Sequence, residues 1–444
     1  MNFAPTNPTP IRRRPASPAR QGRAAKRRGV AVGFLIVTLV FLAGFVALGL
    51  NTSRLLHTKA ELRAVCQSAA LAGARELLDE GVLYGYPDKR DDVLMAREAA
   101  RLLGRANRVD GRVVVLDPNP KNLPLGDVVV GTVDPLGPVG LPLGLPVDPE
   151  KPQAVNTVRV SATLNDNVFN RVSLWLGKLT GVLTADTAAS AQATLDTRIA
   201  GFKPERGVKA PVVPLAAEYG AWLKQAEAEP VAGVNDRFTV NPQTGQVTSG
   251  PDGIPEIVLN CGPNPPPAAS RSTESTEVAD AAPTDDTSAA TAESEDAADE
   301  SAIGAAWCVA LDLVNDQKLP YIWPVRCREG LSIGDLSAVG GQLVLAGGAL
   351  VMPRVRPLPD EVPYGLMDIV GQSRAWPLFE GYTEGDAPTC TLVGFAAARI
   401  LTVAQSPDGS WELVAQPTTM VSSQAVTAPY MNSNPWIGKL ELTQ

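Results

Sequence analysis

The chain has 444 residues, which is enough for two domains or for one domain with long appendages. Hydrophobic residues make up 45% and charged residues 19%, as in globular proteins, and the formal net charge is −8. The single histidine, His57, argues against a histidine general base and against a metal held by several histidines. The composition therefore favours a protein that is not an enzyme.

The charge is distributed unevenly along the chain. Residues 1–29 contain eight Lys or Arg residues and no acid, so with +8 in this tail and −8 overall the remaining chain carries −16. Basic tails can bind nucleic acid. This tail directly precedes a long apolar segment, so we interpret it as a membrane-orientation signal and expect no nucleic-acid partner. Its content of Pro, Ala and Ser predicts a disordered cytoplasmic tail.

The apolar segment at residues 30–50 reads VAVGFLIVTLVFLAGFVALGL and contains no charged residue. A helix that spans a bilayer needs about 20 apolar residues, whereas the apolar core of a cleaved signal peptide has about 7–15. A buried helix of a soluble protein is rarely apolar on every face. We therefore predict one transmembrane helix in the lipid bilayer. The basic residues before it predict a single-pass membrane protein with a cytoplasmic N-terminus and an extracytoplasmic C-terminal region.

Small residues occur at helical spacing in and after this segment. Gly29 and Gly33 form a GxxxG pattern, which permits close helix packing and a homo-oligomer through the membrane helix. Ordinary lipid-facing composition is the alternative explanation. Residues 51–79 contain no Pro, and their apolar residues recur at helical spacing. They predict a helix that continues the membrane span, with Ala69 and Gly73 on a small-residue face suited to tight packing.

The next part of the chain combines helical and strand patterns. A second helix is expected at residues 91–107 and another at 167–177, and residues 135–152 form a loop rich in Pro and Gly. Short β-branched or alternating stretches predict strands at 112–116, 127–133 and 156–164. We therefore expect an α+β module over residues 51–260.

The order of basic residues, Gly29, an apolar span and the helix RLLHTKAELRAVCQSAALAGARELL resembles TadG-like (TadE/TadG-type) proteins of the Flp, or tight-adherence, pilus assembly system. The residues that match the family pattern are Arg54, Leu55, Glu61, Leu62, Ala69, Ala70, Leu71, Ala72, Gly73 and Ala74. Arg63, Val65, Cys66 and Gln67 depart from it. NTVRVSA (156–162) and LTADTAASAQATL (183–195) are similar to later family segments.

This resemblance implies a membrane-anchored, non-enzymatic assembly component without a cofactor, whose partners are other pilus-assembly or envelope proteins. Related TadE-type pseudopilins are cleaved after a Gly that is followed five residues later by Glu. The fifth residue after Gly29 is Phe34, so we expect an uncleaved anchor.

A strongly acidic segment separates the expected α+β module from the C-terminal region. Between Arg271 and Glu300 there are ten acids and one base, so residues 263–303 are expected to be a disordered linker or an insertion. Residues 304–444 predict a β-rich module, with a hairpin turn at Asp408-Gly409. The expected class is therefore α+β, with one transmembrane helix extended into a long helix, followed by a mixed and then a β-rich exported region.

The cysteines suggest a disulfide if the region is exported. Cys261, Cys308, Cys327 and Cys390 allow three pairings, and a Cys261–Cys308 bridge would close the acidic segment into a loop. Separate buried thiols are the alternative. No zinc site is expected, because the chain has no CxxC motif and no pair of histidines.

No catalytic, cofactor-binding or metal site is predicted. Gly330-Leu-Ser332-Ile-Gly334 matches the GxSxG of serine hydrolases, but that chemistry needs a later histidine, so a turn serine is the simpler reading. One rival function is an envelope protein that binds a glycan or another ligand, which exposed tryptophans among the five in the C-terminal module would favour. A second rival is a membrane-tethered hydrolase that uses carboxylates alone.

Overall fold

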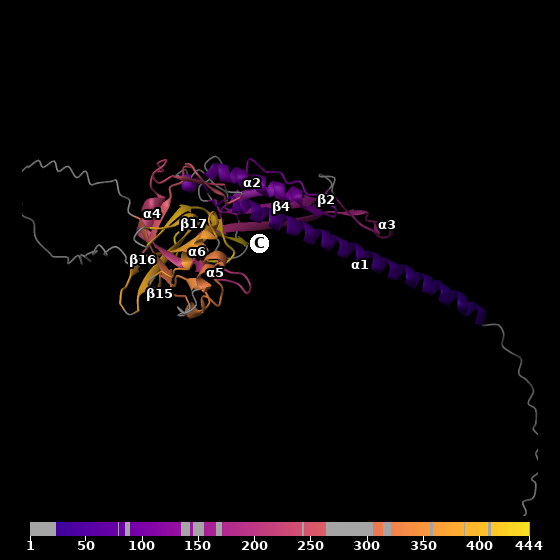
Figure 1. The fold of residues 1–444 in the computed structure, drawn as a ribbon. Coiled ribbons are helices and arrows are strands. Elements are labelled where there is room, and N and C mark those ends of the chain that lie inside the picture. Colours follow the sequence, from indigo (N-terminus) through magenta and orange to yellow (C-terminus); the bar gives the residue numbers. More distant parts are fainter. Residues whose placement is uncertain are drawn as a thin grey trace, which may run out of the picture. The chain divides into compact units, whose positions relative to one another are not determined.

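The computed structural model describes residues 24–78, 80–84, 89–134, 143–144, 155–165, 171–241, 244–262, 305–313, 321–355, 358–385, 387–406 and 410–443 (Figure 1). The acidic segment 263–303, the Asp408-Gly409 turn and most of the loop 135–152 lie outside these residues. The chain forms two compact units. One comprises the residues up to Ala60 with Thr163–Ala188, and the other comprises Glu61–Ala162 with Ala189–Gln444.

The first helix confirms the predicted continuation of the apolar span and corrects its start. Helix α1 runs without interruption over Ala24–Arg75. Residues 24–29 were assigned to a disordered tail, but they belong to this helix. Ala, Lys and Arg are good helix formers, and adding residues to an existing helix avoids the cost of a new nucleus.

In the first unit, the remaining described residues form a small hairpin. Strands β5 (Val172–Ser173) and β6 (Thr184–Ala185) pair antiparallel, and the single-turn helix α3 (Gly177–Thr180) lies between them. Residues 167–170 of the helix expected at 167–177 lie outside the described residues. Over residues 171–176 that prediction is wrong, because the chain is extended at Val172–Ser173 and α3 begins at Gly177. The apolar residues at 172, 174 and 175 fit both the helical period and the strand period, and the pairing with β6 selects the strand.

The second unit contains a five-stranded sheet in the order β19-β21-β7-β4-β3. Its strands are β3 (Val128–Gly131), β4 (Thr157–Leu164), β7 (Thr187–Asp196), β19 (Met420–Val421) and β21 (Ile437–Leu442). Helix α2 (Lys89–Ala106) contacts β3. The end of α1 packs on β4, because a Cβ placed on Gly73 would lie 3.2 Å from the Cγ1 of Val158.

Asparagine side chains cover the outer edge of β3, where backbone groups would otherwise lack partners. The backbone N–H of Val130 donates to Oδ1 of Asn122 at 2.9 Å, and Nδ2 of Asn122 donates to the Val130 carbonyl at 2.8 Å. Asn119 Nδ2 donates to the Val128 carbonyl at 2.9 Å. Both asparagines are buried, and both have a positive φ, a conformation that Asn tolerates better than most residues. The two amides therefore substitute for a neighbouring strand.

The larger sheet has seven strands in the order β12-β18-β17-β15-β13-β9-β16. Additional pairings of β12 with β13 and of β17 with β16 close it on itself. The strands are β9 (Leu215–Glu218), β12 (Ile257–Cys261), β13 (Ala306–Leu311), β15 (Leu350–Val355), β16 (Ser373–Tyr382), β17 (Thr389–Gln405) and β18 (Trp411–Pro417).

This sheet crosses the expected boundary between an α+β module at 51–260 and a β-rich module at 304–444. Strand β12 lies before the acidic segment and β13 after it, yet the two pair parallel, with Leu259 opposite Ala306. Strand β9 also pairs with β13. The acidic segment is therefore inserted between neighbouring strands of one sheet, which is the second of the two arrangements considered from the sequence.

Shorter elements complete the second unit. The helical ones are α4 (Tyr219–Ala226), α5 (Ile322–Glu329), α6 (Val362–Met367) and the 3-10 helices Glu80–Tyr84 and Ser337–Val339. Strands β8 (Ile199–Phe202), β14 (Leu343–Val344) and β20 (Ala425–Thr427) form a three-stranded sheet. Two hairpins are β1–β2 (Arg108–Val109 and Arg112–Val113) and β10–β11 (Phe238–Val240 and Val247–Ser249). The elements together confirm the α+β class.

Aromatic side chains fill the core of the seven-stranded sheet. Trp222 and Trp376 are fully buried and their rings lie 6.1 Å apart, as is usual for interacting aromatic pairs. Of the five C-terminal tryptophans, four are buried and Trp411 is half-buried. These residues pack the core, so the exposed tryptophan cluster that would favour a glycan-binding surface is not present among them.

Candidate functional site

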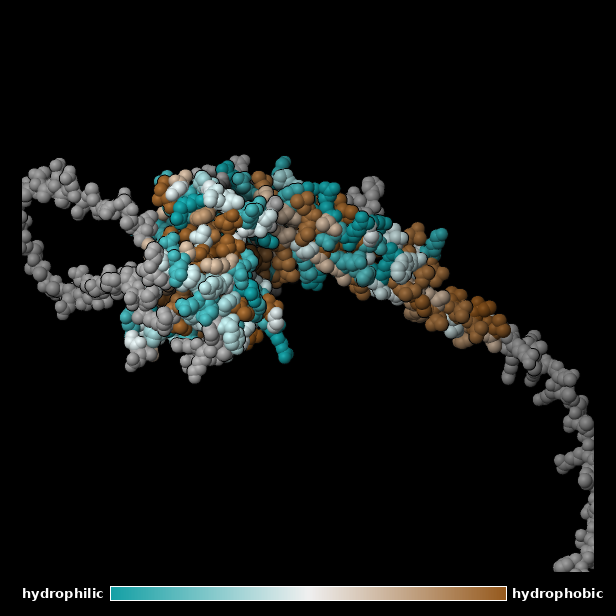
Figure 2. Space-filling view, in the orientation of Figure 1, coloured by the Kyte–Doolittle hydropathy of each residue, from teal (hydrophilic) through white to brown (hydrophobic). Residues whose placement is uncertain are grey.

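The start of α1 presents a continuous apolar surface. Apart from Gly44 and Ala47, every residue from 31 to 50 is exposed, including Phe34, Phe41 and Phe45. Figure 2 shows this stretch as an unbroken hydrophobic surface along the helix. The portion Ala31–Arg75 is long and apolar enough to cross a membrane by length and composition. A stretch of this size exposed to water is a membrane or protein contact surface.

Of the four small residues proposed for helix packing, one lies in this apolar stretch and a second lies just before it. Gly33 is exposed, and a Cβ placed on it would meet no atom within 4 Å. Gly29 is part of α1, just before the apolar residues. Packing through Gly29 and Gly33 would therefore involve another molecule, and it stays a prediction.

The other two small residues contact the chain itself. Ala69 is fully buried, and a Cβ on Gly73 would lie 2.8 Å from the carbonyl oxygen of Ala96 and 3.4 Å from the Cβ of Ala100. Both of these residues belong to α2, so the small face of α1 allows its backbone to approach α2 closely. This face is used within the fold, whereas the apolar stretch at 31–50 remains exposed.

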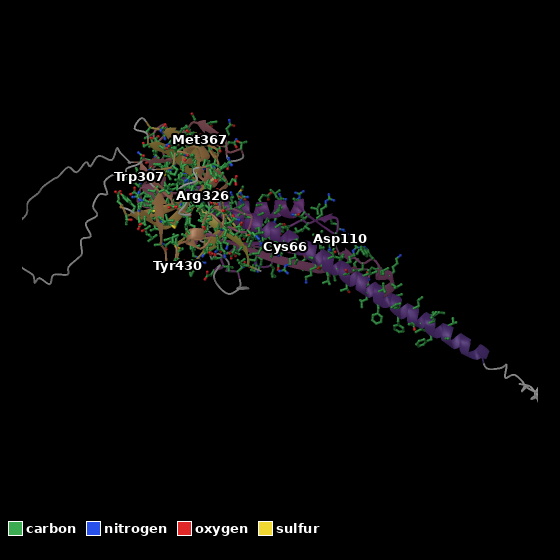
Figure 3. All side chains as sticks on the ribbon, turned by 60° about the horizontal axis from the view of Figure 1, so that its bottom comes forward. Cys66, Asp110, Trp307, Arg326, Met367 and Tyr430 are labelled. Carbon is green, nitrogen blue, oxygen red and sulfur yellow. A yellow bond between two sulfur atoms is a disulfide. The ribbon has the colours of Figure 1, made fainter. Side chains whose placement is uncertain are left out.

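Glu61, one of the residues that match the family pattern, has a structural role in the second unit. Its Oε2 accepts a hydrogen bond of 2.9 Å from the backbone N–H of Asp110. Asp110 is labelled in Figure 3. Asp110 has a positive φ of 50° and lies in the turn between β1 and β2, next to Gly111. A carboxylate bond to a backbone N–H stabilises this uncommon turn conformation and ties the hairpin to α1.

The four candidate disulfide cysteines fall into two groups. Cys261 and Cys308 form a disulfide, and their Cα atoms lie 4.8 Å apart. Cys261 is the last residue of β12, and Cys308 lies within the neighbouring strand β13. Cys327 and Cys390 are free and buried, as is Cys66, so these two candidates do not take part in a bridge. Burial raises the pKa of the Cys327 and Cys390 thiols to about 12 in each case. Both thiols therefore stay protonated and unreactive near neutral pH.

Ser332 of the GxSxG sequence is held in a turn. Its Oγ donates to Oδ2 of Asp335 at 2.5 Å, and Nε of Arg326 donates to Oδ1 of the same carboxylate at 2.8 Å. The serine follows helix α5 and precedes a 3-10 helix, whereas a hydrolase nucleophile lies on a sharp turn between a strand and a helix. The interactions of Ser332 are those of a turn residue that positions Asp335.

Asp335 provides a pH-dependent contribution to stability. Burial raises the pKa of its carboxyl, but hydrogen bonds from Ser332 and Arg326 outweigh burial, so the pKa lies below its ordinary value. The contribution is therefore present above the unfolded-state pKa of about 3.9 and is lost as the pH falls through the folded-state value. We expect Asp335→Asn to lower the free energy of unfolding by about 2 kcal/mol at neutral pH, and by less at acidic pH. Urea titrations of the wild type and the variant at neutral and at acidic pH would measure the two differences in the free energy of unfolding.

A matched control is Asp368→Asn. Asp368 pairs with Arg328 at 3.5 Å, and both side chains are about half exposed. Exposed pairs contribute about 0–1 kcal/mol, so this variant should remain close to the wild type. An Asp335→Asn protein as stable as the wild type at neutral pH would contradict the assignment.

We examined the described residues for a metal site and for a cavity. No group of three or more His, Cys, Asp or Glu in the described part of the chain is arranged to hold a metal ion. A cavity of about 470 Å³ in the second unit is lined mainly by apolar and amide side chains, including Tyr219, Tyr430 and Trp436. Glu227 is the only charged residue that lines it.

Comparison with known proteins finds one family match. The family described as "Putative Flp pilus-assembly TadE/G-like" matches residues 29–76, which cover the apolar stretch of α1 and its continuation. No curated protein and no solved structure shows a significant match to the chain. The matched segment contains the exposed apolar surface, Glu61 and the small-residue face that packs on α2. Residues 29–76 therefore form a TadE/G-like segment, which confirms the resemblance drawn from the sequence and associates this chain with Flp pilus assembly.

Proposed function

We propose that this chain is a non-enzymatic structural component of a Flp-type pilus assembly machinery in the bacterial cell envelope. Its apolar α1 stretch anchors it in the inner membrane as a single-pass protein. The N-terminal tail is cytoplasmic, and the folded units lie on the opposite side. The protein acts by binding other pilus-assembly or envelope proteins, and copies of the chain associate through the Gly29 and Gly33 face of the membrane helix.

The family match over residues 29–76 carries this proposal. Three further observations support it. The apolar residues of α1 are exposed where a bilayer would cover them. Eight basic residues precede them, as expected for a cytoplasmic flank. The Cys261–Cys308 bridge suits an oxidising compartment outside the cytoplasm.

Thiol labelling tests the membrane orientation. Val351 is 62% exposed and lies far along the chain from α1, so Val351→Cys places a reporter in the region proposed to be exported. We expect a membrane-impermeant maleimide to label it in intact spheroplasts. Ser17→Cys in the basic tail should react only after lysis. The native free thiols are buried and should not react with the maleimide before or after lysis.

The reverse labelling pattern would contradict the proposed orientation, and labelling of both sites in intact spheroplasts would contradict the membrane anchor. The pilus assignment itself is tested by deleting the gene in its source cell and counting surface pili by electron microscopy. We expect pili to be lost and to return with the intact chain, but not with a chain that lacks residues 30–50. Normal piliation without the protein would overturn the assignment.

A further inference from the structure

The tip of the β5–β6 hairpin, residues 174–183, has a well-specified conformation. The backbone N–H of Leu174 donates to the carbonyl of Leu183 at 2.9 Å and closes the tip. Gly181 ends α3 with a φ of +79°, which favours glycine. A Cβ on Gly177 would lie 2.5 Å from the Val182 carbonyl oxygen, so this close approach also requires glycine. The tip is therefore a protrusion of defined conformation on the first unit.

This hairpin tip exposes large apolar side chains. Trp175 is 68% exposed, Leu179 62%, Val182 53% and Leu183 59%. Lys178 is the only charged residue between 174 and 183. Four large apolar side chains exposed to solvent within ten residues indicate a contact surface. The tip thus has the composition of an element that enters an apolar environment.

The hairpin tip lies beside the end of the apolar stretch of α1 (Figure 1). The backbone N–H of Leu176 donates to Oδ1 of Asn51 at 3.1 Å, and Asn51 is the first residue after the apolar run. The Arg54 guanidinium carbon lies 4.9 Å from the centroid of the Trp175 ring. Ala47, about 6 Å earlier along the helix axis, is fully buried although its neighbours are exposed. These contacts place the tip level with the point where α1 would leave a bilayer.

We propose that the hairpin tip is a second membrane contact, which enters the headgroup and upper acyl region of the leaflet from which α1 emerges. The proposal rests on the membrane anchoring proposed above. Trp at the interface and Leu or Val just below it match the usual depth preferences of these side chains. The exposed Lys178 ammonium extends to lipid phosphates. With α1, the tip gives two points of attachment and restricts rotation of the first unit about the helix axis.

Depth-dependent quenching tests this contact in the full-length protein. Leu179→Cys is labelled with an environment-sensitive NBD fluorophore, since the native free thiols are buried. The protein is reconstituted into vesicles of phosphatidylcholine and phosphatidylglycerol that contain doxyl-labelled lipid. Phe41→Cys in the apolar stretch and Val351→Cys in the second unit carry the same label. Val351 is the matched exposed control, because its exposed fraction equals that of Leu179.

We expect the label at residue 179 to be quenched most by doxyl groups near the headgroups, roughly two-fold or more above the label at 351. The label at 41 should be quenched most by doxyl groups deep in the acyl chains. If the label at 41 is quenched but the label at 179 is quenched no more than the control at 351, the tip contact is overturned and the anchor remains. This is also the result expected if the tip binds a protein instead of lipid. Absence of quenching at both sites would overturn the proposed anchoring, and the tip contact with it.

A charge substitution provides a second, independent measurement. Val182→Glu adds a carboxylate to the apolar tip and should abolish the headgroup-region quenching of the label at 179. Ser173→Glu adds the same charge at an exposed position of β5, outside the tip, and should leave the quenching unchanged. Equal quenching in the two variants would contradict a contact made by the apolar side chains.

Discussion

Replacing both Cys261 and Cys308 with alanine is expected to lower the free energy of unfolding by about 4 kcal/mol. The two residues are separated by 47 positions, and a bridge across a loop of this length restricts the unfolded chain by about that amount. The bridge also joins β12 and β13, which lie side by side in the seven-stranded sheet. Guanidinium titrations followed by the fluorescence of the buried tryptophans, with wild type and variant in the same detergent, would measure the difference.

Shortening the loop separates the entropic effect of the bridge from its packing effect. Deleting residues 271–300 reduces the separation of the two cysteines from 47 to about 17 residues and leaves residues 262–270 and 301–305 to connect the parallel strands β12 and β13. The bridge should therefore contribute about 0.9 kcal/mol less in the shortened chain. Reductant should destabilise the wild type as much as the double substitution does, and should not affect the double variant. Equal contributions in the long and short chains would contradict a loop-closure origin.

The second large expected effect is on the contact between α1 and α2. Gly73→Leu should lower the free energy of unfolding of the second unit by about 3 kcal/mol, because over-packing of a close contact costs about 1–3 kcal/mol and sometimes more. The nearest atom to the added Cβ is the backbone carbonyl oxygen of Ala96, at 2.8 Å, and a carbonyl inside a helix has little freedom to move. The melting temperature, followed by near-ultraviolet circular dichroism, should fall by roughly 6–10 °C.

Gly33→Leu is the matched control, because it makes the same change in the same helix where no atom lies within 4 Å. It should leave the melting temperature unchanged. Because we propose that Gly33 packs against a second copy in the membrane, this variant should in addition reduce disulfide cross-linking between copies that carry Val37→Cys. A Gly73→Leu protein that melts like the wild type would contradict the close contact of α1 with α2.

The contrast between these two glycines defines which part of the matched family segment is available to partners. The portion of α1 around Ala69 and Gly73 is covered by the chain's own α2 and β4. The apolar residues between 31 and 50 remain exposed. Assembly through α1 is therefore expected in the membrane-spanning portion, and contacts outside the membrane must use other surfaces of the folded units.

Local patterns were sufficient for several elements of the fold. The uninterrupted apolar run and the helical spacing after it predicted the continuous helix α1, and residues 91–107 anticipated α2 closely. Strand β4 was expected at 156–164 and is observed at Thr157–Leu164. These predictions succeed because helix and strand periods are properties of adjacent residues. The TadE/G-like segment was recognised for the same reason, since its pattern is contiguous.

Other features depend on contacts between residues distant in the chain. Residues 167–177 carry apolar spacing that fits a helix, but pairing with β6 makes part of this stretch a strand. The amide groups of Asn119 and Asn122 cover a sheet edge, and no sequence motif predicts this arrangement. The interactions of Ser332 became clear only when Asp335 and Arg326 were placed beside it.

The sequence by itself determined that this protein has an apolar span with a basic N-terminal flank, a helix that continues the span, a TadE/G-like segment and an acidic segment that is a linker or an insertion. These follow from composition and from short-range periodicity. Only the tertiary structure decided that strands on both sides of the insert share one sheet, that Cys261 pairs with Cys308, and that the small face of α1 is covered by α2. The physical reason is that strand pairing and close packing are energies of contact between distant segments, and many arrangements satisfy the same local pattern.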